Sequence, residues 1–190
     1  MTYGKSYAYK IVNDMETDTA PREEAEKSWY AVYTIVRHEK SVDGRLTDND
    51  IETFLPLMEV ESQWKDRKKK VFHPLFPGYL FVRIGSDDAA CMINILNTRG
   101  VVRILSSNGS YEPVPSKQIE SVKRLLEAKV ELDPYKHLIK GTDVLVVNGP
   151  LKGVRGRVLE RKSGHRLIVS IDIIKRSVSV VVDPADLEIV

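Results

Sequence analysis

Histidine, cysteine and paired acidic residues are the side chains in this sequence that could carry catalysis or bind a metal. The four histidines, His38, His73, His137 and His165, lie far from one another along the chain. Metal ligands on one helix or turn are usually roughly three to five residues apart, and no two of these histidines have that spacing. The sequence therefore predicts no metal site, and each histidine is interpreted as a surface or turn residue.

The remaining chemical groups give no catalytic arrangement. The single cysteine, Cys91, excludes an internal disulfide and lies in an apolar helical pattern, where a small buried side chain is expected. Asp87 and Asp88 are typical of a helix start. Residues 153–156 contain two glycines but lead into a strand, so they do not match a phosphate-binding loop. No cofactor is expected, and an enzyme is the least favoured class.

Basic residues gather at two places, although the formal net charge is only +2. One cluster is Lys65-Asp66-Arg67-Lys68-Lys69-Lys70. The other is residues 152–176, where eight basic residues face only Glu160 and Asp172. Such clusters fit a contact with an anionic surface such as nucleic acid. Solvated turns would explain them equally well, so charge alone leaves both interpretations open.

Length and hydropathy set the class of protein. At 190 residues and 42% hydrophobic, the chain can bury one core or two small ones. No apolar run approaches the roughly 20 residues that span a bilayer, and residues 1–10 lack the apolar segment of a signal peptide. We therefore expect a cytoplasmic protein with no membrane contact.

Patterning divides the chain into four parts. Residues 1–27 are polar and are expected to form a mobile tail. Residues 28–128 alternate strand and helix patterns, which predicts an α+β layer of helices over an antiparallel sheet. Residues 129–140 form the expected linker, and five strand patterns in 141–190 predict a small closed barrel. The expected strands are 29–36, 50–56, 79–84, 101–105, 143–147, 154–160, 166–174, 177–182 and 187–189, with a hairpin over 57–75 and helices over 37–48, 87–97 and 115–127.

Several segments resemble motifs of the NusG family, in the family's order. Pro74-Leu75-Phe76-Pro77-Gly78-Tyr79-Leu80-Phe81-Val82 is similar to the central signature of its N-terminal (NGN) domain. Residues 141–153 resemble the KOW motif that opens its C-terminal SH3-like barrel. The resemblance covers residues 28–190. Trp29-Tyr30-Ala31-Val32, Phe54-Leu55-Pro56 and Thr98-Arg99-Gly100-Val101-Val102 add to it.

The resemblance implies a transcription elongation or antitermination factor that binds RNA polymerase at its clamp helices. The family uses an apolar pocket on the NGN sheet, and the matching candidates here are Tyr30, Phe76, Tyr79 and Phe81. Strand alternation puts Tyr79 and Phe81 on one face and Leu80 on the other. The sequence leaves open which face is core and which is interface.

Within the family, the chain looks most like the specialised UpxY-type transcription antiterminators. Ile174 and Lys175 stand where general NusG proteins carry an aromatic residue and a glycine before the arginine, here Arg176. The family meets ribosomal protein S10 or the Rho factor with this part of the barrel, so this departure puts both contacts in doubt. The expected partner surface of the KOW domain comprises Lys152, Arg155, Ile174, Lys175 and Arg176.

Nucleic acid is the other partner that the resemblance suggests. The hairpin cluster could reach the non-template DNA strand or the nascent RNA, with candidates Trp64, Lys65, Arg67, Lys68, Lys69 and Lys70. One relative in the wider family has a helical C-terminal domain, but β-branched residues here favour strands. A general NusG factor that couples polymerase to the ribosome or Rho, and a ribosomal-type KOW protein that binds RNA, remain alternatives.

Overall fold

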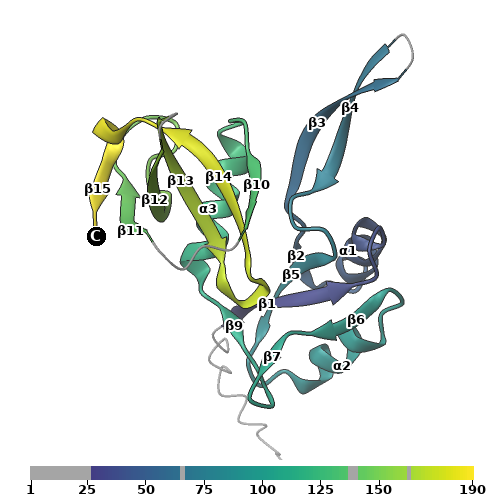
Figure 1. The fold of residues 1–190 in the computed structure, drawn as a ribbon. Helices are drawn as coiled ribbons and strands as arrows, with labels where there is room; N and C mark the ends of the chain where they lie inside the picture. Colours follow the sequence, from purple (N-terminus) through teal and green to yellow (C-terminus); the bar gives the residue numbers. More distant parts are fainter. Residues whose placement is uncertain (1–26, 65–66, 137–140, 162–163) are drawn as a thin grey trace, which may run out of the picture.

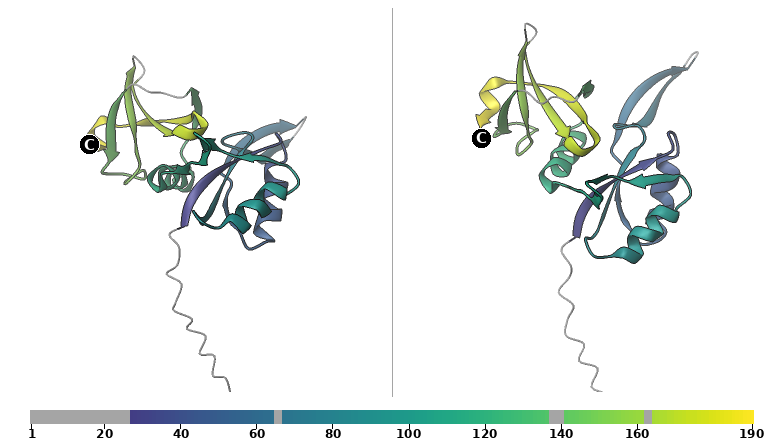
Figure 2. Two further views of the ribbon diagram at one scale, coloured as in Figure 1. Left: turned by 90° about the horizontal axis from the view of Figure 1, so that it is seen from below. Right: turned by 60° about the horizontal axis from the view of Figure 1, so that its bottom comes forward.

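The computed structural model describes residues 27–64, 67–136, 141–161 and 164–190 (Figure 1). They form an N-terminal domain of sheet and helices and a C-terminal domain of strands. Helix α3 (Ser116–Glu127) lies between the two domains, as Figure 2 shows. Of the predicted tail, only Lys27 lies within the described residues, where it begins the first strand.

The N-terminal sheet is antiparallel and centred on strand β1 (Lys27–Thr34). β1 pairs with β5 (Tyr79–Gly85) on one side, and with β6 (Val101–Ile104) and β9 (Pro113–Val114) on the other. β2 (Glu52–Phe54) pairs with β5 and forms the edge. The predicted α+β arrangement is confirmed, with β9 as a strand that the sequence did not predict.

Both faces of this sheet are covered. Helices α1 (Glu39–Thr47) and α2 (Ala89–Asn97) cover one face, and α3 covers the other. Leu80 belongs to the first core and Phe81 to the second, as strand alternation requires. Leu80 and Phe81 are both buried, so neither face of β5 is open at these two residues. The first core contains Tyr30, Val32, Val42, Leu46, Leu80, Val82, Met92, Ile95 and Ile104.

Strands β3 (Leu57–Trp64) and β4 (Arg67–Pro74) form a two-stranded ribbon that projects from the sheet (Figure 1). The pairing continues to Trp64 and Arg67, so most of the predicted basic loop belongs to strand β4. A smaller hairpin joins β7 (Ser106–Ser107) to β8 (Ser110–Tyr111), as its turn residues predict.

The C-terminal domain contains one six-stranded antiparallel sheet with β10 and β15 at its edges. Five of its strands match predicted ones, and the expectation of strands over helix is confirmed. β10 lies in the predicted linker and pairs with β14, so this part of the linker belongs to the sheet. The strands are β10 (Asp133–Lys136), β11 (Thr142–Val146), β12 (Arg155–Arg161), β13 (Gly164–Ile171), β14 (Arg176–Val182) and β15 (Leu187–Ile189), with short 3₁₀ turns at Asp172–Ile174 and Pro184–Asp186.

Candidate functional sites

The described side chains form no cluster of three or more histidines, cysteines or carboxylates that could hold a metal ion. His137 lies outside the described residues. Cys91 lies in the first turn of α2, where its N–H donates to Asp88 Oδ1. Partial burial, and then the Asp88 carboxylate, raise the pKa of the Cys91 thiol, so little reactive thiolate is present near neutral pH. None of the helices in the described ranges has the length and apolarity needed to span a bilayer.

The four aromatic candidates do not share one face of the N-terminal sheet. Phe76 and Phe81 lie in the core beneath α3, with ring centroids 6.4 Å apart in an edge-to-face arrangement. Tyr30 lies in the opposite core, beneath α1 and α2. Tyr79 is half-buried and packs at the margin of the Phe81 cluster. Phe76, Tyr79 and Phe81 are therefore brought together, and Tyr30 is separated from them by the sheet.

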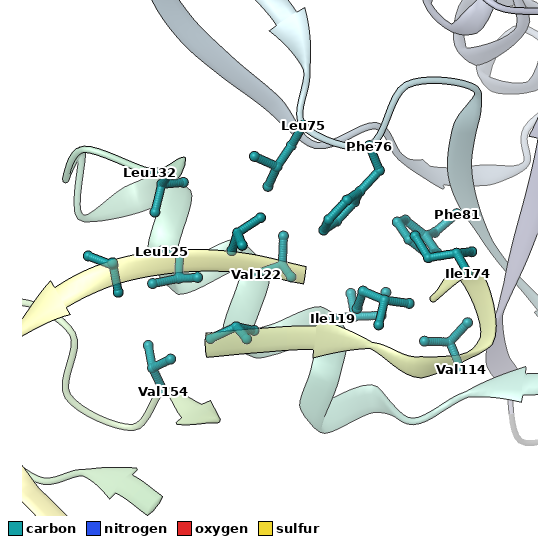
Figure 3. Packing of buried hydrophobic residues seen from close by; sticks show 14 of the residues in the cluster. Leu75, Phe76, Phe81, Val114, Ile119, Val122, Leu125, Leu132, Val154 and Ile174 are labelled. Atoms are coloured by element: carbon teal, nitrogen blue, oxygen red, sulfur yellow. The ribbon is translucent and has the colours of Figure 1, made fainter. Parts of the chain in front are cut away.

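The face that carries Phe76 and Phe81 is covered by parts of both domains. Ile119 and Val122 of α3 lie over it, and Ile174 of the C-terminal domain belongs to the same buried cluster (Figure 3). Phe76 and Phe81 are 1% and 0% exposed, so neither ring is accessible to a partner in this arrangement. Any partner that uses these two rings must first displace what covers them.

Tyr33 and Arg103 extend this aromatic face toward solvent. The rings of Tyr33 and Tyr79 lie 5.2 Å apart, and the Arg103 guanidinium lies 5.6 Å from the Tyr33 ring centre. The nearby Gly78 N–H donates to the buried Glu39 carboxylate, which fixes the turn before Tyr79. The sequence could have indicated Tyr33, because Trp29, Ala31 and Tyr33 alternate along one strand.

A second aromatic group lies at the other end of the same face. Trp29 and Phe54 pack edge to face at 6.3 Å, and Phe54 stacks on Phe81 at 6.1 Å. The Lys123 ammonium lies 4.6 Å from the Trp29 ring centre and 5.2 Å from that of Phe54. The amphipathic pattern of α3 predicts Lys123 outward, but its side chain is half-buried against these two rings.

Hydrogen bonds fix the C-terminal domain to α3. Gln118 Nε2 donates to Asp172 Oδ2 at 2.7 Å, and the Asp172 N–H donates to Gln118 Oε1 at 3.2 Å. The Arg155 N–H donates to Ser121 Oγ, and Arg124 Nη1 donates to the Lys152 carbonyl at 2.8 Å. The polar face of α3 therefore binds the C-terminal domain of the same chain.

The five KOW candidates are only partly free for an external partner. Lys152 and Arg155 use backbone groups to hold α3, and Ile174 is 5% exposed. Lys175 and Arg176 are exposed, and Lys175 adopts a left-handed conformation with φ of 50°. A glycine would adopt that conformation without strain.

One side chain of the hairpin cluster is described. Lys70 is exposed and forms an ion pair with Glu59 across the ribbon, with Nζ and Oε1 2.5 Å apart. The side chains of Trp64, Lys65, Arg67, Lys68 and Lys69 lie outside what the structure describes. Their assignment to nucleic acid stays a prediction.

A polar groove of about 350 Å³ lies between the ends of α1 and α2. Arg45 Nη1 donates to the Arg99 carbonyl, and Asn49 Nδ2 donates to the Arg45 carbonyl, so these bonds fix the groove wall. No sequence motif marks this groove, because its residues come from two helices, which are far apart in the sequence, and a turn. Its lining residues are Arg45, Asp48, Asn49, Asn94, Asn97, Thr98 and Arg99.

Comparison with known proteins identifies the family. A family model described as transcription termination factor nusG matches residues 27–123, slightly more than half of the chain. The chain belongs to the NusG family. The predicted resemblance to NusG is therefore confirmed, and the protein is a NusG-family transcription termination/antitermination factor.

Curated relatives named transcription termination/antitermination protein NusG match most of this NusG-family chain. The protein of Streptococcus pyogenes serotype M1 is 27% identical over 146 residues, which cover 71% of this chain and 81% of the relative. That of Lactococcus lactis is 24% identical over 174 residues, covering 86% and 93%. A solved structure titled domain interaction in Thermotoga maritima NusG has a TM-score of 0.50 at 23% identity, covering 86% and 97%, and supports the fold.

Proposed function

We propose that this NusG-family protein binds the clamp helices of RNA polymerase and suppresses pausing and termination on a particular operon, as UpxY-type antiterminators do. In this proposal the C-terminal sheet is the KOW SH3-like barrel of the family. The resemblance of residues 141–153 to the KOW motif supports that assignment.

The burial of Ile174 is the observation that carries the specialised role. The family uses this part of the barrel to meet ribosomal protein S10 or Rho. Here the side chain is 5% exposed and lies in the cluster that contains Phe76 and Phe81. A residue that packs against its own N-terminal domain is poorly placed to recruit either partner, which favours an antiterminator over a general factor.

A transcription assay with purified polymerase and Rho tests this function. We expect the protein to reduce Rho-dependent termination and to compete with a general NusG for the same polymerase. Enhanced termination would contradict the antiterminator proposal. Direct binding of ribosomal protein S10 by the full chain would instead favour the general factor.

Polymerase binding also requires the two domains to separate. The aromatic face and Ile174 cover each other in this arrangement, so we propose that it is a resting state. Ile174→Asp places a charge in the buried cluster and is expected to increase polymerase affinity several-fold. Val181→Asp, on an exposed side chain of the same domain, is the matched control. Unchanged affinity in an Ile174→Asp protein whose domains have separated would contradict the resting state.

Two surfaces are proposed for nucleic acid near the bound polymerase. The ribbon β3–β4 carries the basic cluster, which would contact phosphates without reading sequence. The groove between α1 and α2 offers arginine and asparagine side chains, which are suited to hydrogen bonds with base edges. Arg99→Ala is expected to change sequence preference on paused complexes. If Arg99→Ala weakens binding equally on every nucleic-acid sequence, Arg99 contacts the phosphate backbone and not the base edges.

The remaining alternative is a ribosomal-type KOW protein that binds RNA. The basic residues of the C-terminal domain agree with it, but it leaves the whole N-terminal NusG domain without a role. We therefore rank it below the two polymerase-binding functions.

A further inference from the structure

Lys123 has an unusual environment for a helix lysine. Its ammonium lies within 6 Å of two ring centres, at 4.6 Å from Trp29 and 5.2 Å from Phe54, which is the range of a cation–π contact. Among the side chains that the structure describes, no carboxylate lies within ion-pair distance of Lys123. The two aromatic rings are therefore the groups that hold this charge.

The rings and the lysine come from separately supported parts of the fold. Trp29 and Phe54 are on β1 and β2, and Phe54 is fixed further by its stack on Phe81. Lys123 is on α3, which packs on the sheet through Ile119 and Val122 and is also held by hydrogen bonds to the C-terminal domain, such as that of Gln118 with Asp172. The walls of the site can therefore persist when the lysine leaves.

We propose that Trp29 and Phe54 form a two-walled site for a cationic side chain of a protein partner, and that Lys123 fills this site while the domains are closed. The walls select a lysine or arginine because a cation is attracted by the electron-rich faces of both rings. Once the C-terminal domain no longer holds α3 in place, rotation of the Lys123 side chain away from the rings would offer the same rings to the partner. Assigning that partner to RNA polymerase rests on the proposed function, but the cation site itself does not.

The competition between Lys123 and an added cation gives a direct test. The full chain with Trp64→Phe retains Trp29 as its one tryptophan, since the sequence has two. n-Butylammonium, a mimic of the lysine side chain, and neutral 1-butanol are titrated at constant ionic strength while Trp29 fluorescence is recorded. Lys123→Ala is compared with the parent and with Lys123→Arg, which keeps the charge.

In Lys123→Ala we expect saturable binding of n-butylammonium, about two- to fivefold tighter than 1-butanol. The parent and Lys123→Arg should show no saturation over the same range, and Phe54→Ala combined with Lys123→Ala should lose the preference. Circular dichroism checks folding, and Lys123→Ser replaces Lys123→Ala if that variant unfolds. Equal binding of amine and alcohol, or binding by the parent as tight as by the variant, would overturn the proposal. Loss of polymerase binding with this titration intact would count against the proposed function alone.

Discussion

Gln118 and Asp172 form a reciprocal pair that joins α3 to the C-terminal domain. The Gln118 amide donates to the Asp172 carboxylate at 2.7 Å and accepts from the Asp172 N–H at 3.2 Å. Both groups of the amide are used, so the pair fixes the orientation of the turn as well as its distance from the helix. That turn, Asp172–Ile174, ends at the isoleucine that covers the aromatic face.

Replacement of Gln118 should loosen the domain contact without unfolding either domain. Gln118→Ala removes both hydrogen bonds of the pair, for an expected loss of about 1 kcal/mol, or about fivefold in the ratio of closed to open molecules. Small-angle scattering or NMR of the full chain would measure that ratio. Glu120→Ala, an exposed change on the same helix, should leave it unchanged. A double-mutant cycle with Asp172→Ala that gives no coupling energy would contradict this role.

The close contact between Gly153 and Arg124 predicts the effect of a single methyl group. A Cβ at Gly153 would lie 2.0 Å from Arg124 Nη1, and the residue has φ of 86°. Gly153→Ala should cost about 2 kcal/mol in unfolding free energy, because the strain adds to the loss of the Arg124 bond to the Lys152 carbonyl.

Gly109→Ala is the control for Gly153→Ala, because Gly109 has φ of 84° and open space around it. Its cost should be about 1 kcal/mol from backbone strain alone. In an Arg124→Ala background, the cost of Gly153→Ala in unfolding free energy should fall to that of Gly109→Ala. Chemical denaturation measures the parent and all four variants, and an undiminished cost in that background would show that Arg124 is irrelevant.

Lys175 holds a left-handed conformation that a glycine would adopt more easily. Lys175→Gly should raise the unfolding free energy by about 0.5–1 kcal/mol. Lys175→Ala also removes the charge but keeps the Cβ, so it should give no gain in thermal unfolding. Equal stabilisation by both variants would assign the effect to charge.

The basic ribbon should make salt-dependent contacts with nucleic acid. Charge reversal at Lys68, Lys69 and Lys70 is expected to weaken binding to paused complexes, with a larger loss at low salt because phosphate contacts release counterions. Glu59→Gln removes one negative charge that pairs with Lys70, so it is expected to strengthen binding to the same complexes. Unchanged affinity of the triple variant at low salt would remove nucleic acid from the function of this ribbon.

The spacing of apolar residues along the chain predicted the helices and strands well, because the buried face of each element sets that spacing. Ile119, Val122, Leu125 and Leu126 recur at helical spacing in the predicted helix over 115–127, and the first three are fully buried. What periodicity could not show is that the opposite, polar face also docks. Gln118 and Ser121 are equally compatible with solvent, and their partners lie more than 30 residues away.

Two differences between the sequence prediction and the structure have local physical causes. β10 contains Pro134, which is typical of a turn but is tolerated in an edge strand. Tyr30 was grouped with Phe76 and Phe81 by motif position, although Tyr30 and Ala31 must face opposite sides of the sheet. Alternation along β1 would have separated them.

Strand β10 limits how far the two domains can move apart. While β10 stays paired with β14, the connection between α3 and the C-terminal sheet is residues 128–132, whose fully extended reach is roughly 17 Å. If β10 detaches, the connection lengthens to residue 141, and its fully extended reach grows to roughly 49 Å. The pairing of β10 with β14 therefore sets the length of the connection between the domains. With the pairing intact, a released C-terminal domain stays close to Phe76 and Phe81. With the pairing lost, it can move through a much larger volume.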